Sequence, residues 1–185
     1  MNREKLLCRA KRLDNGKWIE GFYVRMPVVD VNDLIEIGDP MPDTAADCIM
    51  IVKVKRYQDR VSGQRLATVV QETHRVDPET VCRYTGLQDI HGKRIFEWDF
   101  ITCTRYIGGL RKDALTKWGL VLERHGAFGI LQNYVRLESW QVPYTFRPFK
   151  GWLEDYEYEV TGNKYDNPTL WGRFTRAGGP GLRYE

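Results

Sequence analysis

The chain has 185 residues, a net charge of +3 and four cysteines, and 42% of its residues are hydrophobic. A chain of this length buries enough surface to fold as one domain without a disulfide or a metal ion. The charge permits contact with nucleic acid, but it falls short of the strongly basic composition that argues for it. The cysteines are widely spaced and form no C-x-x-C motif, which excludes the usual zinc-site patterns and predicts reduced thiols.

The first residues, MNREKLLCRAKRLDNGKW, are charged and lack the apolar run of a signal peptide. No stretch of the sequence approaches the roughly 18 continuous apolar residues of a membrane span. We therefore expect a cytoplasmic protein that does not enter a membrane. No cofactor motif or metal-ligand spacing is present, so we expect neither a cofactor nor a metal.

Residues 3–12 contain five basic side chains and one acidic side chain. The segment CRAKRLDNGKWIEGFYVRM predicts two strands joined at Asp14-Asn15-Gly16, because Asn and Gly tolerate the positive φ of primed hairpin turns. Cations that alternate along such a strand form either a solvated face or a phosphate-binding stripe. The solvated face is the favoured interpretation.

An acidic insertion follows over residues 27–47, and the irregular composition continues to Val52. It contains three prolines and no Lys or Arg, which predicts a loop. Its six acids do not follow the order of an EF-hand, so a solvated loop is favoured over a calcium site. Next, residues 48–58 and 64–76 predict two strands joined across 59–63, with Lys53, Lys55 and Arg65 on the solvent side.

The order Asp77-Pro78-Glu79 predicts a short helical turn through Cys82, with Asp77 as N-cap. Gly86 is expected in the left-handed conformation. Gly92 is expected to close a tight turn over residues 89–93, after which residues 94–103 predict a strand.

In an extended chain Glu97 and Asp99 would share one face at roughly 6–7 Å. Paired carboxylates at such distances hydrolyse glycosides, but no third group stands out in the sequence to adjust either pKa. A structural role, in which these side chains cap a turn or bond backbone N–H groups, is favoured over catalysis.

Residues 116–133 predict another hairpin, with His125-Gly126 at its tip and His125 as an exposed turn residue rather than a general base. In WLEDYEYEV, strict alternation places the aromatic side chains and Val160 on one face and the acids on the other. An acidic outer stripe is typical of a protected sheet edge. The Gly-rich residues 173–185 are expected to form a flexible tail.

The segment VCRYTGLQDIHGKRIFEWDFI, residues 81–101, resembles the signature of the YopX family of bacteria and their phages. YEVTGNKYDNPTL, residues 158–170, is similar to the closing motif of that family, and residues 8–24 are similar to its opening hairpin. The residues that match the two motifs, to which we assign structural roles, are Tyr84, Thr85, Gly86, Leu87, Gly92, Glu97, Asp99, Gly162, Asn163, Tyr165, Asn167 and Pro168.

The resemblance implies a mainly β protein with an SH3-like barrel core, additional hairpins and short helical turns, carried by prophages and mobile elements. It implies one domain over residues 1–185, made of hairpins in 1–75, a family core in 76–172 and the tail. It implies no established reaction, and no catalytic residue can be assigned from it. Where relatives commonly have Gly, this chain has Trp98, which implies a backbone without positive φ and an aromatic contact special to this subgroup.

We expect a phage-derived accessory protein that acts by binding a protein partner or a second copy of itself. The aromatic residues, including Trp152 and Trp171, motivate this expectation. The first alternative is a small β-barrel that binds nucleic acid. Its candidate contacts are Arg3, Lys5, Arg9, Lys11, Arg12, Arg83, Lys93 and Arg94. The second alternative is an enzyme of an unrecognised class, although none of the common phosphate-binding, hydrolase, metalloprotease or dinucleotide motifs is present.

Overall fold

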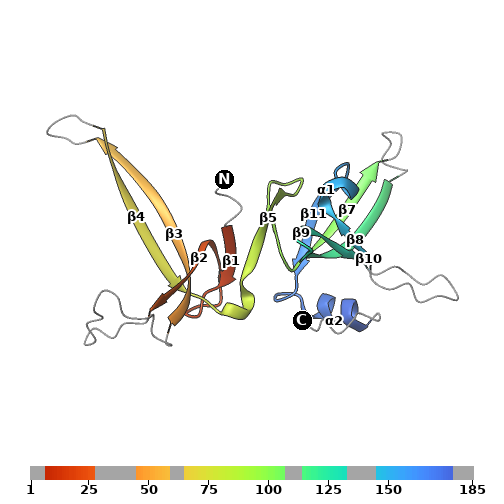
Figure 1. Cartoon of the computed structure of the whole chain (residues 1–185), viewed down its shortest axis with the longest axis horizontal. Helices are drawn as coiled ribbons and strands as arrows, with labels where there is room; N and C mark the ends of the chain where they lie inside the picture. Colours follow the sequence, from red (N-terminus) through yellow and green to blue (C-terminus); the bar gives the residue numbers. More distant parts are fainter. Residues whose placement is uncertain (1–6, 28–44, 59–64, 107–113, 133–144, 177–185) are drawn as a thin grey trace. The chain divides into compact units, whose positions relative to one another are not determined.

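The computed structural model describes residues 7–27, 45–58, 65–106, 114–132 and 145–176. The protein is mainly β and its sheets are antiparallel, as the sequence predicted. The chain divides into two compact units, residues 1–83 and residues 84–185 (Figure 1). The single domain over residues 1–185 stays a prediction. Among the described helices, none has the length and apolar composition to cross a membrane.

The amino-terminal unit is built from two hairpins. Its sheet has the order β4-β3-β2-β1, and β1 also pairs with the first two residues of β5. The strands are β1 (Leu7–Lys11), β2 (Trp18–Pro27), β3 (Ala45–Gln58), β4 (Arg65–Arg75) and β5 (Cys82–Gln88). A small core of this unit contains the buried side chains of Cys8 and Ala10 from β1, Ile49 from β3 and Val76 directly after β4. Both predicted hairpins are confirmed.

The turn between β1 and β2 differs from the predicted primed type. Gly16 has a φ of +66°, and its N–H donates to the Arg12 carbonyl at 2.9 Å. Asn15 is not at positive φ. Its side-chain oxygen instead accepts the Lys17 N–H at 3.0 Å. The loop is therefore wider than a two-residue turn. The Asn15 side chain stabilises it by bonding the local backbone.

The predicted irregular span ends earlier than expected. β3 begins at Ala45, so the prediction of irregular structure was wrong for residues 45–52, whereas the strand predicted over residues 48–58 is confirmed and starts three residues earlier. Residues 45–50 pair with β2, and Cys48 and Ile49 are buried. Asp47 accepts a hydrogen bond from the Tyr23 hydroxyl and lies 3.7 Å from the Arg25 guanidinium. The other acids of the insertion lie outside the described residues.

The helical turn after β4 is confirmed in a shorter form. A 3₁₀ helix spans Pro78–Thr80, and the Asp77 carboxylate caps it by accepting the Glu79 N–H at 3.0 Å. It ends before the predicted Cys82 because the chain enters β5 there. Thr80 is buried, and its hydroxyl oxygen accepts the Lys11 N–H at 2.8 Å.

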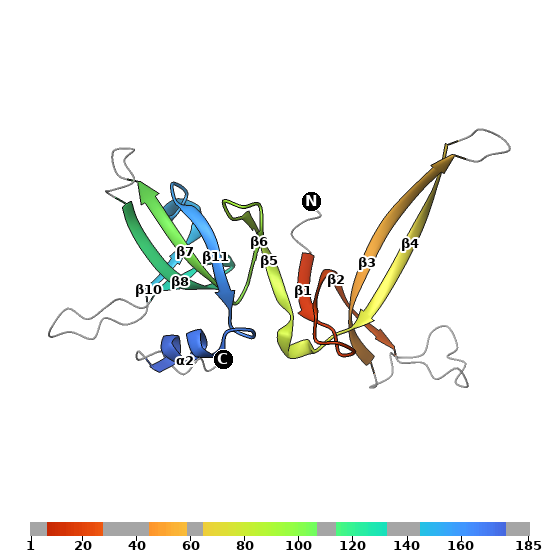
Figure 2. The ribbon, with the colours of Figure 1, turned by 180° about the vertical axis from the view of Figure 1, so that it is seen from behind.

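The carboxyl-terminal unit contains a five-stranded antiparallel sheet with the order β10-β9-β8-β7-β11 (Figure 2). β6 pairs with β5 beside it in the sequence, and two short helical segments complete the unit. These elements are β6 (Arg94–Phe96), β7 (Asp99–Tyr106), β8 (Ala114–Arg124), β9 (Ala127–Gln132), β10 (Thr145–Pro148), α1 (Phe149–Trp152), β11 (Glu157–Asn163) and α2 (Pro168–Arg176). Within the described strands β10 and β11 end the sheet, so a closed SH3-like barrel is not confirmed.

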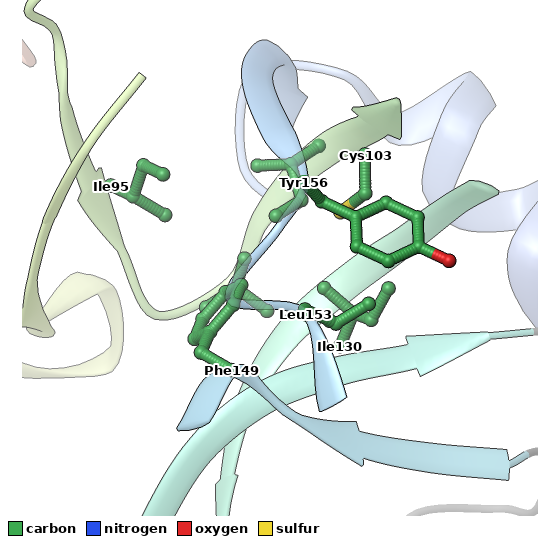
Figure 3. Close-up of a cluster of buried hydrophobic side chains, with 8 residues drawn as sticks. Ile95, Cys103, Ile130, Phe149, Leu153 and Tyr156 are labelled. Carbon is green, nitrogen blue, oxygen red and sulfur yellow. The ribbon is translucent and has the colours of Figure 1, made fainter. Parts of the chain in front are cut away.

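One face of this sheet covers the main hydrophobic core. Figure 3 shows part of this cluster, in which buried side chains from β7, β9 and the α1 region lie together and Ile95 of β6 lies to their side. The labelled residues are Ile95, Cys103, Ile130, Phe149, Leu153 and Tyr156. Tyr158 and Val160 of β11 pack against the same cluster, whereas Glu157 and Glu159 are exposed. The predicted alternation of this strand and its position at a sheet edge are confirmed.

The other face carries an aromatic layer with α2. Phe100 stacks on Trp118 with a centroid distance of 5.0 Å, and Phe174 of α2 meets both rings at 5.9 Å. Phe174 is buried, and α2 continues to Arg176. The prediction of a flexible tail from residue 173 was therefore wrong for residues 173–176, because Phe174 packs in the core. Residues 177–185 lie outside the described residues.

The tip of the β8–β9 hairpin confirms the predicted role of His125. His125 is exposed in a turn and has a φ of +52°, and Gly126 follows at +76°. Two consecutive residues at positive φ are the signature of a type I′ hairpin turn.

Candidate functional site

The turn over residues 89–93 binds the edge of β11. One oxygen of the Asp89 carboxylate accepts the N–H groups of His91 and Lys93, each at 2.9 Å. The other oxygen accepts the Val160 N–H at 3.3 Å, and the Ile90 N–H donates to the Tyr158 carbonyl at 2.9 Å. Burial would raise the pKa of Asp89, but these backbone hydrogen bonds outweigh it and lower the pKa. The predicted tight turn is confirmed, and its function is to cover a sheet edge.

The left-handed glycine before this turn lies within a strand. Gly86 has a φ of +87°, as predicted, but it is part of β5. The register shifts between the pairs Tyr84–Phe96 and Gln88–Arg94, so Gly86 lies in an irregular, bulged part of the strand. The Thr85 hydroxyl links this bulged part of β5 to β6 by donating to the Ile95 carbonyl at 2.8 Å, and Leu87 packs against the core.

Glu97 and Asp99 do not form the carboxylate pair that an extended strand would give. The chain turns at Glu97 and Trp98, between β6 and β7, so residues 94–103 are not one strand. Asp99 is fully buried, and its carboxylate accepts the Phe96 N–H at 2.8 Å. The Asp99 carboxylate thus closes this turn, a contact of the kind that a structural role requires.

Trp98 is the point at which the two signature motifs meet. Its φ is +66°, so the expectation that a Trp here avoids positive φ was wrong. Its N–H donates to the Val121 carbonyl at 2.9 Å, and its carbonyl accepts the Lys164 N–H at 3.0 Å. Its ring meets Trp171 edge to face at a centroid distance of 6.3 Å, which is an aromatic contact of the kind expected. These contacts from both sides hold a backbone conformation that costs a non-glycine residue about 1–2 kcal/mol.

Lys164 lies among three aromatic rings. Its ammonium nitrogen is 4.1 Å from the centroid of Trp98, 5.0 Å from Trp171 and 5.4 Å from Tyr165. Cation–π attraction of this kind is worth about 0.5–2 kcal/mol. Because the Lys164 N–H also bonds Trp98, the cluster fastens the closing motif to the signature at residues 81–101. The aromatic rings are occupied by the chain's own cation, so they form a structural contact.

The closing motif builds the start of α2. The Asn163 side-chain oxygen accepts the N–H groups of Tyr165 and Asp166, each at 2.9 Å. The Asn167 side-chain oxygen accepts the Asn163 N–H at 2.9 Å, and Pro168 is the first residue of α2. A Cβ at Gly162 would overlap the Asn167 side-chain oxygen, which explains why glycine is needed there. The structure therefore gives these matched motif residues folding roles.

The predicted nucleic-acid contacts are divided between the two units. Arg9 is only 7% exposed, and its guanidinium lies 4.6 Å from the centroid of Trp18. Lys11 also lies over Trp18, at 5.5 Å, and Arg12 forms an ion pair with Asp14. The expectation of a solvated cationic face was therefore wrong for Arg9, because the Trp18 ring covers it. Three further candidates, Arg83, Lys93 and Arg94, are exposed, and two, Arg3 and Lys5, lie outside the described residues.

A surface that the sequence analysis missed lies on the β3–β4 hairpin. β2 pairs with β3 only as far as Met50, and beyond this point β3 pairs with β4 alone among the described strands. We call this part, residues 51–58 and 65–72, the β3–β4 ribbon. Figures 1 and 2 show it as a long two-stranded extension of the amino-terminal sheet. Its missed signal was the run KVKR at 53–56, in which one alternating face carries Lys53 and Lys55 and the other carries Val54 and Arg56, so neither face is apolar.

The β3–β4 ribbon exposes valines and cations together. Val52, Val54 and Val69 are 41%, 56% and 59% exposed, and the register places Val54 opposite Val69 on one face. Four cations of the ribbon are also exposed: Lys53, Lys55, Arg56 and Arg65. Lys53 forms a 2.7 Å ion pair with Glu72, whose pKa is lowered by this hydrogen-bonded lysine.

The described thiols are poor candidates for nucleophiles. All four cysteines are free and buried. Burial raises the pKa of Cys103 to about 12 and also raises the pKa of Cys48. Across the described ranges, no group of three or more His, Cys, Asp or Glu side chains is arranged to hold a metal ion.

The comparisons with known proteins give one match. A search of curated proteins and a search of solved structures each find no match. The family model described as "YopX protein" matches residues 46–171. The match begins in β3 and includes both signature motifs and the aromatic cluster around Lys164, whereas the opening hairpin precedes it. Because it covers more than half of the chain, this protein belongs to the YopX family.

Proposed function

We propose that this YopX-family protein acts by binding, without catalysis, and that the β3–β4 ribbon is its binding element. The observation that carries the proposal is the exposure of three valines on one face of a two-stranded ribbon. A two-stranded ribbon alone is only marginally stable in water. Exposed apolar side chains grouped on such an element mark an interaction surface. The carboxylates of the signature segment support a function without catalysis, because Asp89 and Asp99 accept backbone N–H groups and so have structural contacts.

The expected setting is the cytoplasm of a bacterium that carries the gene on a phage or prophage. The buried, reduced thiols fit a reducing compartment. We retain an SH3-like barrel as the interpretation of the carboxyl-terminal unit, in which short antiparallel strands cover the core of Figure 3 with one face of their sheet. In this proposal that unit is the scaffold.

A protein partner or a second copy is favoured by the valines. We would measure the molar mass by sedimentation over a range of concentrations for the wild type and for the variant Val52→Thr/Val54→Thr/Val69→Thr. Threonine keeps the β-branched shape while it adds a hydroxyl. The matched control is Ile90→Thr, at a residue that is 54% exposed in the other unit. Association that the triple variant alone abolishes would support self-association through the ribbon.

Nucleic-acid binding is the second candidate function. It is favoured by the four exposed cations of the β3–β4 ribbon. Among the described residues of the ribbon, Glu72 alone is acidic, and it is paired with Lys53. The two candidates use the same element, so one set of variants tests both.

A further inference from the structure

We infer that the β3–β4 ribbon binds double-stranded DNA by lying in its major groove. This inference rests on the proposed function, since it takes the ribbon to be the binding element. It transfers the nucleic-acid contacts from the amino-terminal strand, where Arg9 is buried under Trp18, to a part of the chain that sequence reasoning did not select.

The β3–β4 ribbon carries an excess of positive charge. The described ribbon carries Lys53, Lys55, Arg56 and Arg65 against Glu72. The ion pair with Lys53 neutralises Glu72. The net charge of the whole chain is only +3, whereas these residues of the ribbon carry four cations against one acid. A local cluster of this kind attracts the phosphate backbone even when the whole protein is nearly neutral.

The shape of the ribbon is the second argument. Two paired strands lie about 4.8 Å apart, and with their side chains they are about as wide as the major groove of B-DNA, which admits a two-stranded ribbon. The register runs without interruption from the pair Ile51–Glu72 to the pair Gln58–Arg65. At about 3.4 Å per residue this gives a ribbon roughly 24 Å long. Because β2 pairs with β3 only as far as Met50, the β3 edge of this length is unpaired among the described strands, and exposed side chains lie on both of its faces.

The two faces of the ribbon carry different side chains. Alternation places Val52, Val54 and Arg56 of β3 on one face, and the register adds Val69 and Arg65 of β4 to it. Apolar side chains contact the thymine methyl group, and Arg reaches phosphates or guanine. Lys53, which is paired with Glu72, and Lys55 lie on the other face, where the long side chain of Lys55 remains in solvent and can reach phosphates at the groove walls.

The competing occupants fit this surface less well. A second copy docked ribbon to ribbon would bring two sets of like charges together. Double-stranded RNA has a major groove too deep and narrow for side chains to read, so the geometry selects DNA. We therefore expect duplex DNA to bind more tightly than duplex RNA of the same sequence.

The experiment is fluorescence anisotropy of a labelled DNA duplex, titrated with the full chain over a series of salt concentrations. The same titration is made with the corresponding RNA duplex. The test variant is Arg56→Gln/Arg65→Gln, which keeps long polar side chains on the face of the valines. The matched control is Lys17→Gln/Lys150→Gln, which removes the same net charge at two exposed residues outside the ribbon. Circular dichroism checks that both variants are folded.

We expect saturable DNA binding whose log affinity falls with log salt, with a slope between about −1.8 for two phosphate contacts and about −2.7 for three. The test variant should reduce the magnitude of the slope by up to about 1.8, and the control should leave it unchanged. Three results would overturn the inference: no DNA binding at the lowest salt, equal losses in both variants, or RNA bound as tightly as DNA.

The failure of the inference and the failure of the proposed function are distinguishable. If DNA does not bind but Val52→Thr/Val54→Thr/Val69→Thr abolishes self-association, the inference is wrong and the ribbon remains the binding element. If the protein neither binds DNA nor changes its association with that variant, both fail.

Discussion

Asp89 and Val160 are separated by 71 positions in the chain, yet the Asp89 carboxylate accepts the Val160 N–H. The same carboxylate closes its own turn through His91 and Lys93. One side chain therefore orders a local turn and covers the outer edge of β11. In the other unit β4 ends the sheet of described strands. The chain thus protects the edge beside its family motif and keeps the β3–β4 ribbon exposed.

Replacement of Asp89 by Ala should destabilise the protein. Asp89 is buried, and its loss removes the acceptor of three backbone N–H groups. These donors are partly buried, and a buried donor left without an acceptor costs about 1–3 kcal/mol, so we expect the free energy of unfolding to fall by about 1–3 kcal/mol. Urea unfolding followed by circular dichroism measures this change. Asp155→Ala is the exposed control and should shift the value by less than about 0.5 kcal/mol. Equal midpoints for the two variants would contradict the assignment.

Asp89 should also contribute to acid sensitivity. Its pKa is lowered in the folded state, so the folded protein binds the proton less tightly than the unfolded chain. The resulting stabilisation is present above the ordinary aspartate pKa of 3.8 and is lost as the pH falls through the lowered value. Asp89→Asn, which does not titrate, should flatten the pH dependence of the free energy of unfolding in this acidic range. An unchanged acid profile in this variant would show that other carboxylates dominate.

Trp98 offers a test of backbone conformation in which the usual order of Gly and Ala is reversed. Both Trp98→Ala and Trp98→Gly lose the indole packing against Lys164 and Trp171, which should cost about 3–5 kcal/mol. Because φ is +66°, Ala retains a left-handed strain that Gly avoids. Trp98→Gly should therefore be more stable than Trp98→Ala by about 1 kcal/mol in urea unfolding. An Ala variant that is the more stable of the two would rule out the strained conformation.

Two glycines should respond oppositely to Ala. At Gly162 an added Cβ would overlap the Asn167 side-chain oxygen and lie 3.0 Å from its Cγ, so Gly162→Ala should cost about 1–3 kcal/mol. At Gly172, inside α2, an added Cβ meets nothing within 4 Å. Gly172→Ala should therefore stabilise the helix by about 0.5–1 kcal/mol. Thermal unfolding of both variants measures the pair, and a neutral Gly162→Ala would refute the close approach to Asn167.

The buried core should make the protein sensitive to alkali. Burial raises the pKa of Cys103 from 9.0 to about 12, and burial is also the main cause that raises the pKa of Tyr158 to about 12. Groups whose pKa is raised by folding stabilise the protein fully below their unfolded pKa, and this contribution is lost as the pH rises through the folded value. The free energy of unfolding should therefore fall between about pH 9 and 12, with a smaller slope in Cys103→Ala. Identical slopes in wild type and variant would show that this thiol is not buried.

Local patterns in the sequence predicted the hairpins and several of the turns, although the turn at Glu97 and Trp98 and the type of the β1–β2 turn escaped them. Asp77-Pro78 marks the 3₁₀ helix, Gly92 closes the turn at 89–93, and His125-Gly126 forms the tip of a hairpin. The alternation in β11 predicted which side chains are buried. These features depend on the conformational preferences of neighbouring residues, so a short stretch of sequence is enough to predict them.

Contacts between distant segments decided the rest. Trp98 adopts positive φ because Val121 and Lys164 bond its backbone, and no neighbouring residue signals this. Arg9 is buried because Trp18 of the next strand covers it, whereas an isolated strand would expose its cations. The ribbon has an unpaired β3 edge among the described strands because β2 leaves β3 at Met50, and side chains on both of its faces are exposed. Such features depend on which elements pack together, and the physical reason they escape sequence analysis is that burial is a property of the packed structure and not of a single strand.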